Sequence, residues 1–342
     1  MATGSTPLQP LAGDFKDTIA LALAQEEAVR GFAGAAVVAG VRSVFLVGCG
    51  GSLAGMYPAH YLLETKAPFP VFHMNSDEFC RRRPALLGEG SVVVVSSHSG
   101  NTKETVAAAR IAREARARVA AITRSADCPL AMAADTAYTY DSDTTVPAPR
   151  QVLMGQLAHA LLEAAGAEGD YTGLRTAYEA LPDALYAALE ESEGTNHAIA
   201  TALADEDITY VLSAGPNYGA GYAFAMCYLM EMQWKHAASF HAGEFFHGAF
   251  EILTQDQPVL LLLGEDASRP IAERARAFLD AHTRKVHHID TAALNLPGVP
   301  THLRGEISPI ALAVVTSRLA RHFEAVRGHD LAQRRYMFQG DY

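Results

Sequence analysis

The chain has 342 residues, 49% of them hydrophobic and 19% charged, and carries a net charge of −11. This size and composition fit a globular protein of roughly two domains, each of about 150 residues. The acidic balance, the short arginine clusters at 81–83 and 334–335, and the absence of any apolar run near the ~20 residues of a membrane span argue against nucleic-acid binding and against membrane insertion.

The first half of the chain alternates strand-length apolar segments with helical segments. Residues 1–15 have neither the basic start nor the apolar core of an export signal, so we expect a cytoplasmic protein. A helix is predicted over 15–39, and strands are predicted over 42–47, 68–74, 91–97 and 118–125. Such alternation requires a parallel sheet covered by helices on both faces. The sequence therefore predicts a doubly wound α/β domain over residues 15–168.

The second half repeats this organisation. After a turn-rich segment at 141–150 and connecting helices over 151–193, residues 207–232 repeat the strand, glycine loop and apolar helix of residues 42–64. Residues 258–282 repeat a later strand–helix step. We therefore predict the α/β class, with two doubly wound parallel-sheet domains in tandem. The second domain is expected over residues 190–330, followed by a tail over 331–342.

Two polar loops in the first half are predicted to bind an anion. In GCGGS, Gly50 and Gly51 allow the backbone to approach a ligand, and Ser52 stands at a helix start. The loop that ends the valine strand is rich in hydroxyls, and ligands of open α/β sheets gather at the carboxyl ends of strands. Its candidate binding residues are Ser97, His98, Ser99 and Thr102. A phosphate monoester suits such hydroxyls and N–H groups, although a glycine turn with a serine cap also occurs in many α/β proteins.

No cofactor or metal is predicted. Neither loop has the GxGxxG of a dinucleotide fold or the GK[ST] that accompanies a triphosphate and magnesium. The four cysteines show no CxxC spacing, so neither a disulfide framework nor a zinc site is expected.

The second half carries the candidate acid–base groups. Glu231 is the one charged residue in the helix YAFAMCYLMEMQW, where apolar surroundings favour a raised pKa and proton transfer. The alternative is a solvent-facing Glu231 paired with Lys235. Glu244 and His247 follow in a glycine-flanked segment. This E-x-x-H pair could ligate a metal, but carboxylate di-metal sites need two such motifs. A structural histidine is the remaining alternative.

The loops GCGGS and SSHSGNTKET, together with the similar second half, resemble the SIS (sugar isomerase) domain, which binds phosphosugars. The resemblance covers nearly the whole chain. It implies that Ser52, Ser97, Ser99 and Thr102 hold the phosphate of the sugar. His98 departs from the glutamine often found between the two serines, so its role stays open.

The segment GEFFHGAFE resembles the catalytic loop of the isomerase half of glucosamine 6-phosphate synthase and of the fructosamine 6-phosphate deglycases. In both, a glutamate lies sixteen residues before a histidine, as Glu231 and His247 do, while Ala249 replaces the usual proline. The resemblance implies that the glutamate moves a proton between C1 and C2. It implies that the histidine opens the sugar ring, reaching in the dimer into the neighbour's site.

The tail favours the deglycases over the synthase. The chain lacks the synthase's glutamine-hydrolysing domain, and Gln333 lies about where the synthase has its ring-opening lysine. The tail's RRYM with its final tyrosine, HAGEFFHG and LLLLGEDASR resemble the deglycases that act on fructoselysine or fructose-asparagine 6-phosphates. The tail is therefore expected near the active site.

The resemblance implies a homodimeric enzyme with shared active sites that hydrolyses an Amadori conjugate of fructose 6-phosphate to glucose 6-phosphate and the free amine. A phosphosugar ketose–aldose isomerase or an amino-sugar phosphate deaminase is the alternative. A phosphosugar sensor would need an effector domain, and the sequence contains no candidate for one. The amine on the substrate stays open, and Glu244 could orient His247 or contact that amine.

Overall fold

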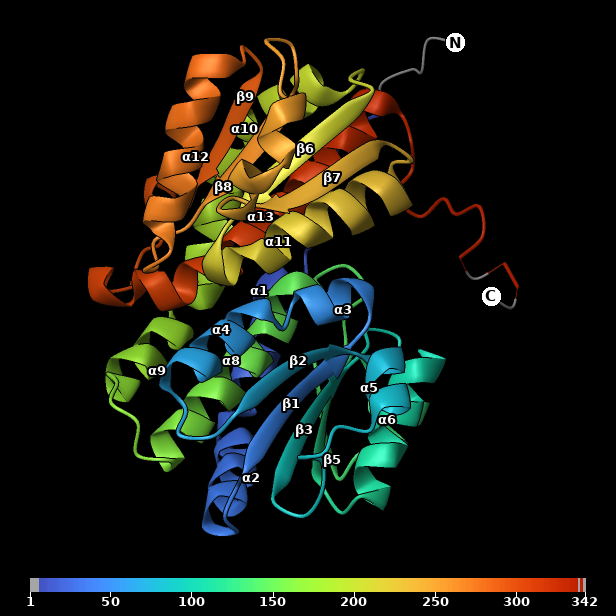
Figure 1. The fold of residues 1–342 in the computed structure, drawn as a ribbon, viewed down its shortest axis with the longest axis vertical. Helices are drawn as coiled ribbons and strands as arrows, with labels where there is room; N and C mark the ends of the chain where they lie inside the picture. The colour runs from blue at the N-terminus through green and yellow to red at the C-terminus, as the bar shows by residue number, and fades with distance from the viewer. Residues whose placement is uncertain (1–5, 338, 341–342) are drawn as a thin grey trace. The chain divides into compact units, whose positions relative to one another are not determined.

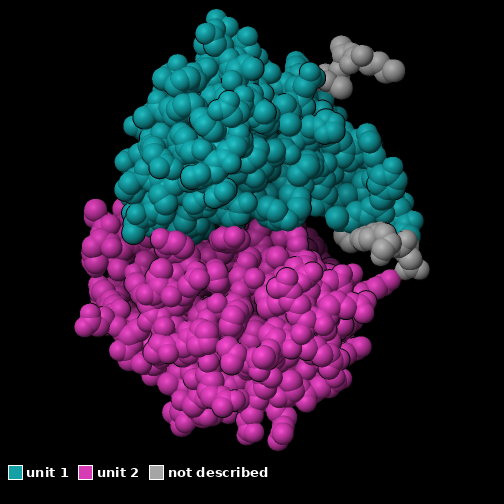
Figure 2. Space-filling model, in the orientation of Figure 1, with its two compact units in different colours: residues 1–11, 185–296, 307–342 teal, residues 12–184, 297–306 magenta. Residues whose placement is uncertain are grey.

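The computed structural model describes residues 6–337, 339 and 340. The chain divides into two compact units (Figure 2). Unit 2 comprises residues 12–184 and 297–306, and unit 1 comprises residues 1–11, 185–296 and 307–342. Each unit contains one parallel sheet.

The sheet of unit 2 has five parallel strands in the order β2-β1-β3-β4-β5. The strands are β1 Ser43–Gly48, β2 Val71–Asn75, β3 Ser91–Ser96, β4 Arg118–Thr123 and β5 Thr136–Thr139. The sheet of unit 1 has four parallel strands in the order β7-β6-β8-β9. They are β6 Ile208–Ser213, β7 His236–His241, β8 Val259–Leu263 and β9 Val286–Asp290.

Helices follow the strands in both units (Figure 1). The α-helices are α1 Phe15–Leu23, α2 Glu26–Val38, α3 Gly50–Ala54, α4 Tyr57–Lys66, α5 Ser76–Arg82, α6 Lys103–Glu114, α7 Pro129–Ala133, α8 Pro147–Ala164, α9 Tyr171–Glu179, α10 Leu181–Leu203, α11 Tyr218–Ala223, α12 Arg269–His282 and α13 Arg304–Arg327. A π-helical segment, η2 Phe224–Met232, continues α11. Short 3₁₀ turns are η1 Gly215–Asn217, η3 Glu244–His247, η4 Ala249–Ile252, η5 Thr291–Ala293 and η6 Thr301–Leu303.

Each sheet is buried on both faces. In unit 2, α5, α6 and α7 pack on the face that carries Phe45, Val93 and Val119, and Figure 1 shows α2 on the opposite side of the sheet from α5 and α6. In unit 1, α10 and α13 pack on one face of the sheet and α12 packs on the other. Side chains of successive strand residues point to opposite faces, so strands buried on both sides become continuous apolar runs. The predicted class, two doubly wound α/β domains in tandem, is confirmed.

Some local predictions are wrong. The single helix expected over 15–39 breaks between α1 and α2, where Gln25 Nε2 donates to Thr139 O (2.7 Å) and Gln25 Oε1 accepts from Thr139 N (3.1 Å). The break therefore lets Gln25 satisfy the open edge of β5. The turn-rich segment was expected to extend to Arg150, but it ends at Val146. Helix α8 begins at Pro147, because proline is well suited to the first turn of a helix.

A polar cluster joins residues 297–306 to the rest of unit 2. The carboxylate of Glu306 accepts from Lys66 Nζ (2.6 Å) and lies 2.8 Å from His159 Nε2. Burial would raise the pKa of Glu306, but these hydrogen bonds and charges together lower it to about 2.

No helix in the described part of the chain is long and apolar enough to cross a membrane.

Gly100 turns the loop after β3 and should not tolerate a side chain. Its φ is +67°, and an added Cβ would overlap the Cys128 sulfur and lie 2.7 Å from Cys128 Cβ. We expect Gly100→Ala to destabilise the fold by roughly 2–4 kcal/mol, because left-handed strain and overpacking add. Urea denaturation followed by circular dichroism measures this.

Gly34→Ala is the matched control. Gly34 lies inside α2 with open space around its Cα, so alanine there should stabilise the protein by about 0.5–1 kcal/mol. Equal unfolding midpoints for wild type and Gly100→Ala would contradict the proposed strain.

Candidate functional site

The register of the unit 2 sheet brings the two predicted anion-binding loops to one edge. Gly48, which ends β1, pairs with Ser96, which ends β3. Ser96 in turn pairs with Ile122 near the end of β4. Because the strands are parallel, the loops that follow them start side by side at the carboxyl edge, where α/β folds bind ligands.

The loop after β3 presents hydroxyls beside a helix start. The hydroxyls of Ser97 and Thr102 are 2.8 Å apart, and Ser97 Oγ accepts from Gly100 N (3.2 Å). Thr102 occupies the N-cap position of α6, but its side chain makes no capping hydrogen bond. No side-chain cap therefore occupies the N–H groups in the first turn of α6, which leaves them available to an anion.

Helix α8 places a buried cation, which the sequence analysis missed, beside the loop after β1. Ser52 is buried in α3, and its hydroxyl accepts from Arg150 Nη1 (3.3 Å). Arg150 is 9% exposed, its Nε has no hydrogen-bond partner, and it forms no ion pair within the described residues. A buried charge without a counter-ion is costly. This arrangement suits a bound anion, and the sequence signal was a single arginine in the apolar helix PAPRQVLMGQLAHALL.

His98 is held by its own neighbours. Its Nδ1 lies 2.8 Å from the Tyr140 hydroxyl, and its Nε2 lies 3.5 Å from Asp143, which also pairs with Arg124. Burial lowers the pKa of His98, and the positive charge of Arg150 lowers it further. The His98 ring is therefore uncharged around neutral pH, and its contacts with Tyr140 and Asp143 hold the loop in place.

The other predicted binding residues make local contacts. Ser99 is exposed, and its hydroxyl accepts from Asn101 N (3.2 Å). Gly50 and Gly51 are the half-buried first residues of α3. Their backbone is thus accessible from the loop side.

Glu231 lies in the π-helical segment η2 of unit 1. Gln233 N donates to Tyr228 O, five residues back, at 3.0 Å, and π-helical turns are frequent at functional sites. The Glu231 carboxylate lies 3.0 Å from Arg334 Nη2. Burial raises the pKa of Glu231, and Arg334 opposes that rise. The half-buried carboxyl therefore has the raised pKa expected of a proton-transfer group.

The alternative pairing of Glu231 with Lys235 is wrong. Lys235 Nζ donates instead to the backbone carbonyls of Ala204 (2.9 Å) and Glu206 (2.5 Å). The real partner, Arg334, is about a hundred residues away in sequence, so helical spacing could not identify it. The tail around it carries Gln333, which is exposed, whereas Phe338, Asp341 and the final Tyr342 lie outside the described residues.

Glu244 and His247 are displayed on the turn η3. Both are exposed, and Phe245 between them is fully buried and anchors the turn. Phe245 packs against Phe246 and Phe278, with ring centroids 5.5 and 6.3 Å away. No hydrogen bond or ion pair within the described residues joins Glu244 to His247. The structure therefore offers no contact by which Glu244 would orient His247.

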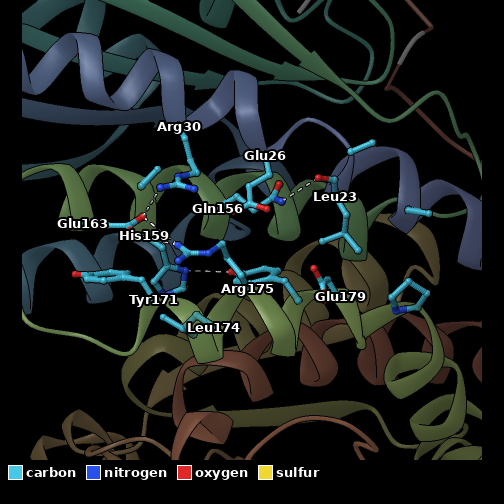
Figure 3. A pocket seen from close by; sticks show the side chains of 15 residues that line it. Leu23, Glu26, Arg30, Gln156, His159, Glu163, Tyr171, Leu174, Arg175 and Glu179 are labelled. Atoms are coloured by element: carbon cyan, nitrogen blue, oxygen red, sulfur yellow. Dashed lines mark hydrogen bonds and ion pairs between the residues drawn. The ribbon is translucent and has the colours of Figure 1, made fainter.

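Unit 2 also contains a cavity of about 380 Å³ between α1, α2, α8 and α9 (Figure 3). Its two arginines are already paired, since Glu163 lies 3.4 Å from Arg30 and 3.1 Å from Arg175. None of the predicted site residues lines it. No cluster of three or more histidine, cysteine, aspartate or glutamate side chains suited to a metal ion occurs in the described part of the chain.

Comparison with known proteins gives consistent matches. Residues 38–164 match the SIS domain family. The chain is 37% identical to fructosamine deglycase FrlB of Bacillus subtilis (strain 168), over 87% of this chain and 92% of that protein. It is 27% identical to fructoselysine 6-phosphate deglycase of Escherichia coli O157:H7, over 86% and 84% of the two chains.

A solved Bacillus subtilis structure, provisionally assigned as a phosphosugar isomerase, has the same fold as this chain. Its TM-score is 0.87 and its sequence identity is 32%. The match covers 95% of this chain and 99% of that one.

Arg150→Met should weaken anion binding without weakening the fold. A charge-assisted hydrogen bond contributes about 1.5–3 kcal/mol, so we expect glucose 6-phosphate and inorganic phosphate to bind roughly 10–100-fold more weakly. Because the variant removes a buried unpaired charge, its melting temperature should stay the same or rise. Isothermal titration calorimetry and thermal unfolding measure both effects.

Arg113→Met is the control, since Arg113 near the other end of α6 is half-exposed and paired with Asp135 (3.1 Å). Undiminished phosphate binding by Arg150→Met would show that this guanidinium does not receive the anion.

Proposed function

Because the chain belongs to the SIS-domain family that includes the fructosamine deglycases, we propose that it hydrolyses a fructosamine 6-phosphate to glucose 6-phosphate and a free amine. The observation that carries this proposal is 37% identity to a fructosamine deglycase over nearly the full length of both chains. A second deglycase, which acts on fructoselysine 6-phosphate, matches a similar span.

Unit 2 is proposed to hold the phosphate group. Ser52, Ser97 and Thr102 would donate hydroxyl hydrogen bonds, and the guanidinium of Arg150 would supply the counter-charge. Ser99, Gly50 and Gly51 are proposed to complete the contacts from the exposed side of the loops. His98 is proposed to act by keeping the loop in place, because Tyr140 and Asp143 already engage its ring.

Glu231 is proposed to transfer the proton. After ring opening promoted by His247, the Glu231 carboxylate removes a proton from C1 while the C2 oxygen takes up a proton from water, which produces an enaminol. The protonated acid then returns its proton to C2, and the nitrogen loses a proton to water, which leaves an imine at C1. Water adds to the imine and releases glucose 6-phosphate and the amine, so the overall reaction is a hydrolysis that balances without a cofactor. A carboxyl with a raised pKa suits both steps.

We propose that the active protein is a homodimer in which His247 serves the partner's site. Supporting this, His247 and Glu244 are exposed and form no hydrogen bond or ion pair within the described residues. Ile252, a few residues on, is an exposed large hydrophobic side chain, as expected at an interface. Glu244 would then be free to contact the leaving amine.

The cytoplasm is the proposed location. Its support is the substrate, since phosphorylated sugars are retained inside cells. The four cysteines are unpaired thiols, which agrees with a reducing compartment.

Loss of either catalytic group should stop turnover and spare binding. We expect Glu231→Gln and His247→Ala to lower glucose 6-phosphate release from fructosamine 6-phosphates by about 10²–10⁴-fold, since general acid–base transfer contributes that much. Glucose 6-phosphate should still bind to both variants. A coupled assay over a panel of amine conjugates measures release and identifies the preferred amine.

Glu251→Gln and His236→Ala are the matched controls, because both side chains are exposed and lie outside the proposed chemistry. No release from any conjugate by wild type, with interconversion of hexose phosphates or deamination of hexosamine phosphates instead, would replace the deglycase proposal with the isomerase or deaminase alternative.

Mixing the two inactive variants tests the shared site. If His247 serves the partner's Glu231, each mixed dimer contains one intact site, so random exchange should restore about a quarter of wild-type activity. If both groups act within one chain, every site in the mixture carries a lesion. Activity is measured after unfolding and refolding the variants together, and each variant refolded alone is the control.

A further inference from the structure

We propose that Arg334 is a positioning residue, which the C-terminal tail brings to Glu231 to keep it as the carboxylate that abstracts the proton. This inference rests on the proposed function and assigns a task to the tail. The sequence analysis noted Arg334 only as part of the tail's RRYM and gave it no role.

The guanidinium of Arg334 is fixed in one orientation. Its side chain is only 13% exposed, and its Nη1 donates to the backbone carbonyls of Leu331 (2.5 Å) and Gln333 (3.0 Å). Those bonds use the tail's own backbone, so Nη2 is left to face Glu231 at 3.0 Å. The buried Nε has no partner. A planar fork anchored on one side presents its other side at a defined angle.

The tail is fastened to the end of the segment that carries Glu231. Gln233 Nε2 donates to His329 O (2.7 Å), and Arg327 Nη1 donates to Gln233 O (2.6 Å). The Trp234 ring lies 4.6 Å from the His329 ring, and the Arg335 guanidinium lies 4.1 Å from the Trp234 ring centroid. These contacts fasten the tail to Gln233 and Trp234, two and three residues after Glu231, and so hold Arg334 near it.

Other charged groups at this helix end do not act on Glu231. Lys235 donates to backbone carbonyls of Ala204 and Glu206, and Arg327 is engaged with Gln233. The neighbouring strand β7 carries His236 and His241, neither of which has an ion pair with Glu231 within the described residues. Burial raises the pKa of Glu231 and Arg334 alone opposes it. Without Arg334, Glu231 would stay protonated to higher pH, so a smaller fraction of it could remove the C1 proton on the acidic side of the profile.

The pH dependence of kcat/KM tests this role. A general base works above its pKa, so loss of Arg334 should move the acidic limb of the profile to higher pH. We expect a displacement of about one pH unit in Arg334→Met, the size typical of an opposite charge within 4–6 Å. Below that limb, activity should fall about tenfold relative to wild type. Arg334→Lys should keep the limb close to that of wild type, because it retains the charge.

Arg335→Met is the matched control, since it removes the neighbouring positive charge, which lies over Trp234 rather than beside Glu231. An acidic limb that stays in place in Arg334→Met, or that moves equally in Arg335→Met, would overturn the proposal. Circular dichroism and phosphate binding confirm that each variant is folded.

A second measurement does not depend on the reaction. Carbon-13 NMR of glutamate-labelled protein, with the Glu231 carboxyl signal assigned by its loss in Glu231→Gln, gives the titration of Glu231 directly. A midpoint about one unit higher in Arg334→Met supports the inference, and an unchanged midpoint overturns it. If wild type shows no deglycase activity, the proposed function fails, but this titration still shows whether Arg334 lowers the pKa of Glu231.

Discussion

The register of parallel strands is the constraint on which the phosphate-binding half depends. Because β1, β3 and β4 run the same way and pair residue by residue, three loops distant in sequence begin at one edge. Helix α8 then supplies Arg150 beside Ser52. No single loop needs strong affinity for an anion, since the sheet gathers weak donors into one place.

Two largely buried arginines, Arg150 and Arg334, differ in what their charge faces. Arg150 has no carboxylate partner in the described residues, so its charge is available to a ligand. Arg334 is paired with Glu231, so its charge changes the behaviour of a protein group. Both cations stand in low-dielectric surroundings, where a charge acts strongly on its neighbours. One therefore contributes to binding and the other to chemistry.

The central strands and the polar loops were predictable from sequence, because runs such as SVVVV and the hydroxyls that follow them are local signals. The edge strands β5, β7 and β9 were not, since TAYT, HAASFH and VHHID are short or polar and become strands only by pairing with a neighbour. The roles of Arg150 and Arg334 were not predicted, for a related reason. The role of each arginine depends on a partner far away in sequence, Ser52 for Arg150 and Glu231 for Arg334, and a single sequence does not show which distant residues are in contact.

In the π-helical segment, the direction in which the Glu231 side chain points depends on the number of residues in the segment as well as on their types. In an α-helix each residue advances the side-chain direction by about 100°. A segment bonded five residues back, as at Gln233 and Tyr228, holds one more residue per closed ring than an α-helix does. A substitution within 224–232 does not change the number of residues in this segment. A one-residue deletion there would restore α-helical bonding and turn Glu231 away from Arg334, so insertions and deletions should be the least tolerated changes in this segment.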